Sequence, residues 1–501
     1  MFNLKFVDSK QDSCMDVVFL IQDEELSRVY QGLDEKSGGL IRKTIADKNI
    51  FKAKYGAKKT LTYVDNDKTH HILLVGLGDA KGLSGYKIEN IGGGIYMSAN
   101  CSQIKNLFID CNYHPKEFDK AEFAALIASG INLRSYRFDK YRTTLKEEDR
   151  SKLEKIYVGV SDVKATEKRF IDLEALVTGI FLARNLISEP ANVLYPESYA
   201  EIIAEELEVL GVGVNILGES EMRDLGMGAL LGVGQGSARE SKLVVMEYYG
   251  ADDKDAKPLA FVGKGVTFDT GGISIKPSAS MWEMKYDMSG SAAVVGLIKA
   301  LAIRKASVNV IGVVGLVENM PGGNAQRPGD VVKTMSGKTA EVLDTDAEGR
   351  LVLADALWYA QDKFKPEIMV NLATLTGAIV VALGSTYAGC FSNNDNLSEK
   401  LVNAGTKVDE KLWRMPLHED YEAMIKSDIA DIANLGNVRG SAGSSTAAHF
   451  LQHFVNEVPW AHLDIAGVAN DKKGSNLAPK GAVGFGIRLL NQFIQDYYET
   501  N

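Results

Sequence analysis

The chain has 501 residues, of which 45% are hydrophobic, and its formal net charge is −10. Single cores seldom grow beyond roughly 300 residues, so this length predicts two domains. The Lys and Arg residues are scattered rather than gathered into a basic tail or stripe, which argues against nucleic acid as the main partner.

The start of the chain, MFNLKFVDSKQDSCMDVVFLIQ, reaches charged residues before any apolar run is long enough for a signal peptide, so we expect no export. The four cysteines lack CxxC spacing, which fits a reducing compartment and provides no thiolate metal site. The longest apolar stretch, residues 368–384, is shorter than a typical membrane-spanning helix and reads as a strand, a Gly turn and a helix. We therefore expect a cytoplasmic protein without a membrane partner.

Short apolar runs alternate with helical patterns from the start of the chain to about residue 160. Strand-like runs occupy residues 16–22, 59–64, 70–78, 106–111 and 155–160, and a helical pattern occupies 120–136. This alternation predicts a smaller N-terminal α/β domain over residues 1–160. A periodic apolar helix that stops near Pro190 then predicts a linker helix region over 161–195.

Residues 196–501 show the same alternation more strongly. A helix is predicted at 198–211, and near-continuous apolar strands are predicted at 242–250, 259–265, 309–317 and 367–375. Uninterrupted apolar strands are typical of a sheet that is covered on both faces. We therefore predict a larger C-terminal α/β catalytic domain with a central mixed sheet.

Charged residues gather in an otherwise apolar and Gly-rich part of this domain. Most lie at the ends of predicted strands or in the loops that follow: Lys264, Asp269, Lys276, Asp287, Asp346, Glu348 and Arg350. Sites in open α/β sheets form at the carboxyl ends of strands. Four carboxylates without histidine suit hard or borderline divalent ions, and two such ions could share bridging carboxylates and an activated water. A solvated acidic loop with ordinary salt bridges is an equally good interpretation of the pattern alone.

The stretch DTDAEGRL, residues 344–351, resembles the signature of the leucyl aminopeptidases, also called cytosol aminopeptidases. It matches Asn-Thr-Asp-Ala-Glu-Gly-Arg-Leu at seven of eight positions. From about residue 175 to 490 the chain keeps the family's order and nearly its spacing in VGKGVTFDTGGISIKP, MKYDMSGSAAVVG, ENMPGGNAQRPGDVV, LATLTGA and WAHLDIAGVA. The resemblance implies a metal-dependent aminopeptidase that releases N-terminal residues, preferentially Leu and other apolar ones, by attack of a metal-bridging water.

The resemblance also implies two divalent ions per subunit, Zn²⁺ or Mn²⁺, with Mg²⁺ as a further option. The tighter ion would be held by Lys264, Asp269, Asp287 and Glu348. The looser ion would be held by Asp269, Asp346 and Glu348. A lysine ligand must be a neutral amine, and the cation itself would lower the lysine pKa.

Catalytic and substrate-binding roles follow from the same resemblance. Lys276 would polarise the scissile carbonyl, and Arg350 would hold a bicarbonate ion that acts as the base. Peptide substrates need a free N-terminus because their α-amine would bind a metal, and the family forms homohexamers. The substrate contacts implied are Thr374, Leu375 and Gly377 for the peptide backbone, and Met284 and Ala466 for the first side chain.

One position departs from the signature, because Asp344 stands where the family has Asn. Its additional negative charge would tighten the looser site or shift its metal preference.

Two other functions stay open on the sequence alone. One is a two-metal phosphoesterase in which Lys276 and Arg350 face a phosphate, and the other is a non-catalytic DNA-binding or regulatory protein on the same fold.

Overall fold

The computed structural model describes residues 2–438 and 440–499, and the chain divides into two compact units. Unit 1 comprises the residues up to Val177 together with Lys473–Pro479, and unit 2 comprises Thr178–Lys472 and the residues from Lys480 onward. Helix α5 (Val163–Ser188) contains the first point at which the chain passes from one unit to the other. The predicted two-domain α/β architecture is confirmed, whereas the limits 1–160, 161–195 and 196–501 stay a prediction.

Unit 1 is built on a six-stranded sheet with the order β1-β6-β5-β2-β4-β3. All neighbouring strands are parallel except β3, which pairs with β4 in the antiparallel direction. The strands are β1 (Asn3–Val7), β2 (Met15–Ile21), β3 (Lys58–Asp65), β4 (Lys68–Gly78), β5 (Asn106–Asp110) and β6 (Lys155–Gly159). The helices before α5 are α1 (Gln31–Lys36), α2 (Leu40–Ala46), α3 (Gly85–Cys101) and α4 (Lys120–Ser135).

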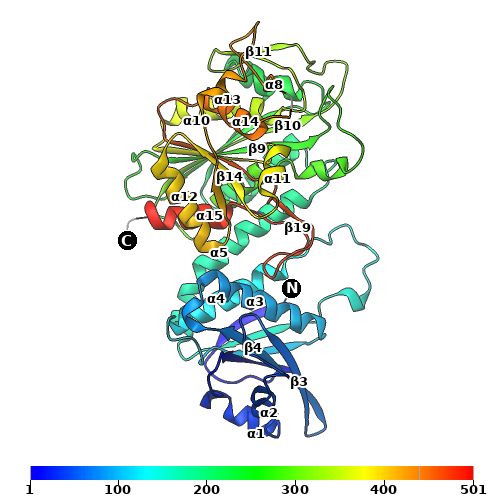
Figure 1. Cartoon of the computed structure of the whole chain (residues 1–501), viewed down its shortest axis with the longest axis vertical. Coiled ribbons are helices and arrows are strands. Elements are labelled where there is room, and N and C mark those ends of the chain that lie inside the picture. Colours follow the sequence, from blue (N-terminus) through cyan, green and yellow to red (C-terminus); the bar gives the residue numbers. More distant parts are fainter. Residues whose placement is uncertain (1, 439, 500–501) are drawn as a thin grey trace. The chain divides into compact units, whose positions relative to one another are not determined.

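Strand β2 explains why this sheet carries helices on both faces. Side chains alternate along a strand, so Val17 and Phe19 point to one face and Val18 and Leu20 to the other. The first pair packs in a core with residues of α3 and α4, and the second pair packs with Ile41 of α2. Figure 1 shows the two groups of helices on opposite sides of the sheet.

The segment Lys473–Pro479 belongs to unit 1 although it lies far along the chain. It packs against Gly93 in the middle of α3, where a Cβ would lie 1.8 Å from the backbone oxygen of Asn476. A larger residue at this position is therefore incompatible with the observed packing, and the absence of a side chain creates the place where the segment docks.

Unit 2 is built on an eight-stranded mixed sheet with the order β15-β14-β17-β13-β9-β10-β8-β7. Its strands are β7 (Gly213–Leu217), β8 (Lys242–Tyr249), β9 (Leu259–Asp269), β10 (Asn309–Asn319), β13 (Ile368–Ala373), β14 (Ala388–Ser392), β15 (Leu412–Arg414) and β17 (Trp460–Asp464). Smaller sheets contain β11 (Val331–Lys333), β12 (Thr339–Glu341), β16 (Ile432–Ala433), β18 (Asn470–Asp471) and β19 (Gly481–Ala482). The predicted central mixed sheet is thus confirmed.

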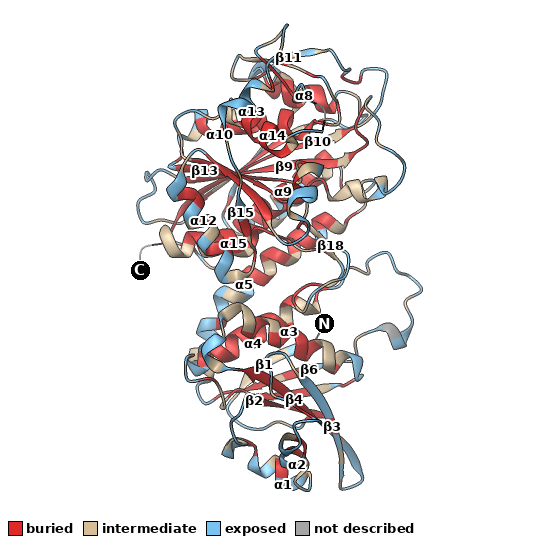
Figure 2. Cartoon of the chain, in the orientation of Figure 1, coloured by how far each residue is buried: buried red, intermediate tan, exposed pale blue. Residues whose placement is uncertain are grey.

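Helices cover both faces of this sheet, as the apolar strands predict. A Cβ at Gly312 of β10 would approach Val294 of α9, whereas one at Gly315 would approach Val352 of α10. Figure 2 shows the resulting buried sheet. The helices that follow α5 are α6 (Pro196–Glu208), α7 (Glu219–Asp224), α8 (Gly228–Gly234), α9 (Ser289–Ile303), α10 (Gly349–Phe364), α11 (Gly377–Leu383), α12 (Asp395–Val408), α13 (Glu419–Ala423), α14 (Gly443–Gln452) and α15 (Ile487–Tyr497).

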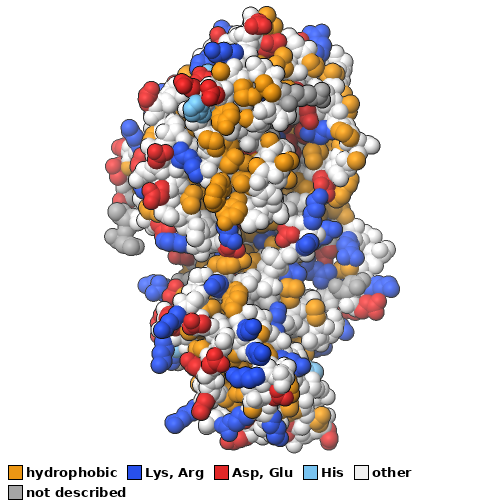
Figure 3. Space-filling view, viewed as in Figure 1, with side chains coloured by type: hydrophobic (Ala, Val, Ile, Leu, Met, Phe, Trp, Pro, Cys, Tyr) orange, Lys and Arg blue, Asp and Glu red, His pale blue; other side chains and the backbone are white. Residues whose placement is uncertain are grey.

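The longest apolar stretch forms the elements that the sequence predicts, and charged side chains of both signs are interspersed on the surface drawn in Figure 3. Residues 368–384 form β13, a turn and α11. Among the described residues, one helical stretch, Met281–Ile303, is long and apolar enough to cross a membrane, but 78% of its most apolar window is buried inside the protein. On the face drawn in Figure 3, basic and acidic side chains lie among one another.

A buried carboxylate, Asp355, ties α10 to two other segments of unit 2. It is fully buried and accepts hydrogen bonds from the backbone N–H groups of Leu230 in α8 (2.9 Å) and Met335 (2.8 Å). Burial raises the pKa of Asp355 to about 7, and the backbone hydrogen bonds oppose that rise. The carboxylate therefore serves as a common acceptor for donors that would otherwise be buried without partners.

We expect Asp355→Ala to lower the free energy of unfolding by about 2–5 kcal/mol, because the buried N–H of Leu230 and the half-buried N–H of Met335 lose their acceptor. Asp355→Asn keeps one acceptor oxygen and is expected to cost less. Asp362, exposed on the same helix, offers the control, and Asp362→Ala should change stability by less than about 0.5 kcal/mol. Denaturant unfolding of the three variants measures this order, and equal stability of Asp355→Ala and Asp362→Ala would contradict it.

Candidate metal centre

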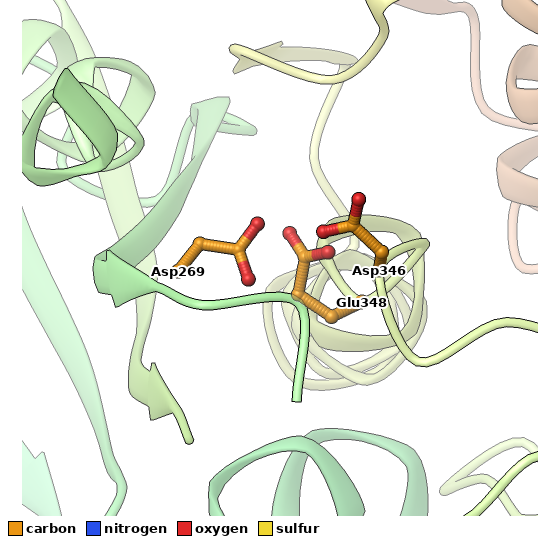
Figure 4. A group of neighbouring side chains, drawn as sticks. All are labelled: Asp269, Asp346 and Glu348. Carbon is orange, nitrogen blue, oxygen red and sulfur yellow. The ribbon is translucent and has the colours of Figure 1, made fainter. Parts of the chain in front are cut away.

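Three carboxylates from two parts of unit 2 meet at the end of the central sheet. Asp269 is the last residue of β9, Asp346 lies in the loop before α10, and Glu348 immediately precedes the first residue of α10. One oxygen of each lies within 4.8 Å of one oxygen of each of the others. Figure 4 shows the three carboxyl groups turned toward one another. The predicted clustering at the carboxyl end of a strand is therefore present.

Two lysines lie among these carboxylates. Lys264 Nζ is 2.8 Å from Asp287 Oδ1 and 2.8 Å from Glu348 Oε1. Lys276 Nζ is 2.8 Å from Asp269 Oδ2 and also contacts Asp346 Oδ1. The structure thus joins six of the seven predicted charged residues into one network.

Burial and charge act against each other in this network. Burial lowers the pKa of Lys264 and of Lys276, but the neighbouring carboxylates outweigh it and raise both pKa values above the ordinary lysine range. Burial likewise raises the pKa of Asp287 and of Asp346. The charged forms of these two carboxylates are thus disfavoured even beside two ammonium groups. A further cation bound among them would stabilise those charged forms.

The donor set fits divalent cations. Asp287 Oδ2 is buried and has no hydrogen-bond partner among the described residues, so one carboxylate oxygen inside the cluster is available as a ligand. Carboxylate oxygens with one amine nitrogen suit hard and borderline metals. The interpretation as a solvated acidic loop does not fit, because Asp269, Asp287 and Glu348 are buried.

Hydrogen bonds from uncharged side chains hold the loops that carry the carboxylates. Asn319, the last residue of β10, donates to Asp269 Oδ1 (2.8 Å) and to the backbone oxygen of Thr345 (3.0 Å). Thr345 Oγ1 in turn donates to the backbone oxygen of Gly271 at 2.6 Å. The loop after β9 and the loop before α10 are therefore fastened to each other as well as to the sheet.

Arg350, the seventh predicted charged residue, is buried in the first turn of α10. Its Nη1 donates to the backbone oxygen of Asn434 at 2.7 Å, and its Nε has no partner among the described residues. Burial lowers the pKa of Arg350 to about 10, against the opposing effect of Glu348, Asp464 and Asp344. The guanidinium therefore stays positive near neutral pH and keeps a donor for an anion.

Asp344 does not belong to the group of three carboxylates. Side chains two residues apart on a strand point to the same face, which would align Asp344 with Asp346 and Glu348, but residues 342–348 form no strand. Instead, Asp344 Oδ1 accepts the backbone N–H of Asp346 at 2.9 Å. This local bond between a carboxylate and the backbone two residues on is typical of Asx turns, which favour a turn over a strand.

The predicted substrate-binding residues lie on elements beside this cluster. Thr374 contacts it directly, because its backbone oxygen accepts from Lys264 Nζ (3.0 Å) and its Oγ1 donates to Asp287 Oδ1 (2.8 Å). Gly377 is the first residue of α11, and the backbone oxygen of Met284 accepts from Asp287 N at 3.3 Å. The structure thus brings Thr374 into the network and places Gly377 and Met284 on neighbouring segments.

Leu375 and Ala466 meet through a residue that the sequence analysis missed. The fully buried carboxylate of Asp464 accepts from Leu375 N (3.1 Å), Ala466 N (3.2 Å) and Thr376 Oγ1 (2.6 Å). Burial raises the pKa of Asp464 to about 6, and these hydrogen bonds oppose the rise. An available signal was its place at the end of β17, which matches that of Asp269 at the end of β9.

Comparisons with known proteins agree with this geometry. The model of the cytosol aminopeptidase family, catalytic domain, matches residues 181–491, and that of the family's N-terminal domain matches residues 17–145. The probable cytosol aminopeptidase of Rickettsia bellii (strain RML369-C) is 56% identical over 502 residues and covers 100% of both chains. That of Rickettsia felis (strain ATCC VR-1525 / URRWXCal2) is 55% identical over 500 residues, which are 99% of this chain and 100% of the relative.

A solved structure is also similar over nearly the whole chain. The bottromycin maturation enzyme BotP in complex with Mn has a TM-score of 0.84 at 30% sequence identity, and the match covers 97% of this chain and 99% of that one. The chain therefore belongs to the cytosol aminopeptidase family and is a metal-dependent aminopeptidase.

Proposed function

We propose that the protein releases N-terminal amino acids, preferentially Leu and other apolar residues, from peptides with a free N-terminus. The observation that carries this proposal is the convergence of Asp269, Asp346 and Glu348 on one small volume, with Lys264 and Asp287 directly beside it. This is the residue set that the family resemblance assigns to two metal ions. Nothing in the geometry favours a phosphoesterase or a DNA-binding protein.

We assign the tighter ion to Lys264, Asp269, Asp287 and Glu348, and the looser ion to Asp269, Asp346 and Glu348. Zn²⁺ and Mn²⁺ suit these ligands, with Mg²⁺ as a further option, and the manganese complex of the similar enzyme BotP supports Mn²⁺. When bound, the ions would supply Lewis acidity and a water that ionises near neutral pH. A cation beside Lys264 would also favour its neutral, ligating amine.

The two lysines are suited to different tasks by their exposure. The Lys264 side chain is 3% exposed, which fits a ligand that never meets the substrate, whereas the Lys276 side chain is 21% exposed. Carboxylates raise the pKa of Lys276, so it is an ammonium group at neutral pH. An ammonium group at the opening of the site can stabilise negative charge on the oxygen of the scissile carbonyl.

The remaining roles concern the base and the peptide. The Nε of the buried Arg350, which has no partner within the described part of the chain, supports bicarbonate binding, because a guanidinium matches the planar geometry of such an anion. Thr374, Leu375 and Gly377 would bind the peptide backbone, while Met284 and Ala466 would line the pocket for the first side chain. Asp464 would fix Leu375 and Ala466 relative to each other.

We further infer a cytoplasmic homohexamer. The name of the family and of the Rickettsia relatives supports the cytosol. The hexamer rests on the family resemblance, and sedimentation of the purified protein would measure it.

Hydrolysis of leucine anilide by the chelator-stripped protein tests the proposed function. We expect no cleavage without metal, restored cleavage with Zn²⁺ or Mn²⁺, and no cleavage of N-acetyl-leucine anilide, because acetylation removes the free amine. Equal cleavage of both compounds would contradict the exopeptidase assignment. Cleavage of a phosphoester in place of the anilide would favour the two-metal phosphoesterase.

Asp344→Asn is expected to change the affinity and the metal preference of the looser site more than it changes turnover. An asparagine oxygen can accept the N–H of Asp346 as Asp344 Oδ1 does, so the substitution removes a negative charge without removing the bond. Calorimetric titration of the stripped protein with Zn²⁺ and Mn²⁺ measures the change. Asp344→Ala loses both the charge and the bond to Asp346 N, so comparing it with Asp344→Asn separates the effect of the bond from that of the charge. Equal metal affinities of wild type and Asp344→Asn would refute the charge argument.

Gly349→Ala should weaken the tighter site, because a Cβ there would lie 2.6 Å from Cε and 2.7 Å from Nζ of Lys264. Lys264 would have to move away from Asp287 and Glu348. We expect metal affinity at that site to fall by about 10–100-fold, the usual range for changes beside metal ligands. Gly323→Ala is the matched control, since a Cβ at Gly323 would meet no atom of the described residues within 4 Å. Equal metal affinities of the two variants would be the contrary result.

A further inference from the structure

The loop that carries Asp346 is held by a residue from a distant part of the chain. Asn434 directly follows β16 and is fully buried. Its Oδ1 accepts the backbone N–H groups of Leu343 (2.8 Å) and Asp344 (3.3 Å). Its Nδ2 donates to the backbone oxygens of Asp344 (2.7 Å) and Ala347 (3.2 Å). One side-chain amide thus satisfies four backbone groups of this loop.

The backbone of Asn434 adds two further bonds. Strands β12 and β16 are parallel, with Ala340 opposite Ile432. Asn434 N extends this pairing by donating to the backbone oxygen of Glu341 at 2.9 Å. Asn434 O accepts from Arg350 Nη1 at 2.7 Å. The residue therefore contacts both ends of the segment that runs from β12 into α10.

We propose that Asn434 is a positioning residue that sets the place of Asp346 and thereby the affinity of the looser metal site. This inference rests on the proposed function, because it presupposes that Asp346 is a metal ligand. Within the part of the chain that the structure describes, the hydrogen bonds given for Asn434 go to backbone groups and to Arg350, and not to the side chain of a proposed metal ligand. It acts through the backbone on either side of Asp346 and through Arg350.

The chemistry at this position calls for a primary amide. Two backbone N–H groups need an acceptor and two backbone oxygens need a donor, and an amide presents both on one planar group. A carboxylate would keep the acceptor, lose both donations and bring negative charge beside Asp344. A hydroxyl is too short to reach both sides. An apolar side chain would remove all four bonds, and among the described residues only the backbone oxygen of Asp344 would keep another donor, the N–H of Ala347 at 3.2 Å.

The effect should be selective for one of the two ions. Glu348 directly precedes α10, whose backbone hydrogen bonds help to hold it, and Asp269 is held by β9 and Asn319. Asp346 lies in the irregular loop, so its position depends more on the bonds that Asn434 makes. Asn319 offers the contrast, because its contact with Asp269 concerns a ligand assigned to both ions.

Calorimetric titration of the stripped full-length protein with Zn²⁺ and with Mn²⁺ tests this assignment. For Asn434→Ala and Asn434→Asp we expect affinity at the looser site to fall by about 10–100-fold, while the tighter site stays close to wild type. Asn319→Ala should weaken both sites. Asn437→Ala, at an exposed position three residues further on, should leave both unchanged. Melting temperatures of the metal-free variants show whether each is folded.

Two outcomes would overturn the inference in distinguishable ways. If wild type binds two ions and a folded Asn434 variant binds both as wild type does, or loses both equally, Asn434 does not position the looser site. If wild type binds no metal and cleaves no leucine anilide, the proposed function fails and this inference fails with it. Asn434→Ser, which retains a small polar side chain, provides the same comparison if the Ala and Asp variants do not fold.

Discussion

Carboxylates that share a buried space repel one another, and the centre of unit 2 depends on the positive charge that lies among them. Lys264 and Lys276 each lie between two carboxylates drawn from different segments of the chain. The resulting network joins the end of β9, the start of α9 and the start of α10. These elements can therefore lie together only if positive charge offsets the carboxylates. In this structure the two lysines supply that charge, and bound metal ions would supply it in a metal centre.

A second layer of hydrogen bonds gives this charged cluster its shape. The ligand-bearing segments are loops, whose backbone groups must find partners outside regular structure. Asn319 and Asn434 provide these partners, and Asp464 does the same for the segments that carry Leu375 and Ala466. Each of the three follows or ends a buried strand. The rigid sheet thus determines where the loops lie through side chains that never need to touch a substrate, and sites held in this way keep their geometry during catalysis.

Local sequence patterns predicted the features that depend on neighbouring residues, namely the strands with uninterrupted apolar runs and the charged site. Apolar runs identified β2, β4 and β13, and the charged residues around Lys264 and Glu348 identified the site. The short strands β1, β7 and β14 were missed, because Lys5, Asn215 and Gly389 interrupt their apolar runs. Strands β5 and β6 are equally short, but each contains three consecutive apolar residues and was predicted. Asn434 was missed because it lies 84 residues beyond Arg350, and only the fold brings the two together. The resemblance to a family supplied the roles, which spacing alone left open.

The docking of Lys473–Pro479 on Gly93 bears on how separable the two units are. Unit 2 is not one continuous stretch of sequence, since its chain leaves after Lys472 and returns at Lys480. A fragment that begins at Thr178 would contain the segment Lys473–Pro479 but would lack α3, whose Gly93 the segment packs against. Cutting the chain once within α5 would therefore not separate the two units cleanly, because Lys473–Pro479 would stay with unit 2 and lose the helix on which it packs.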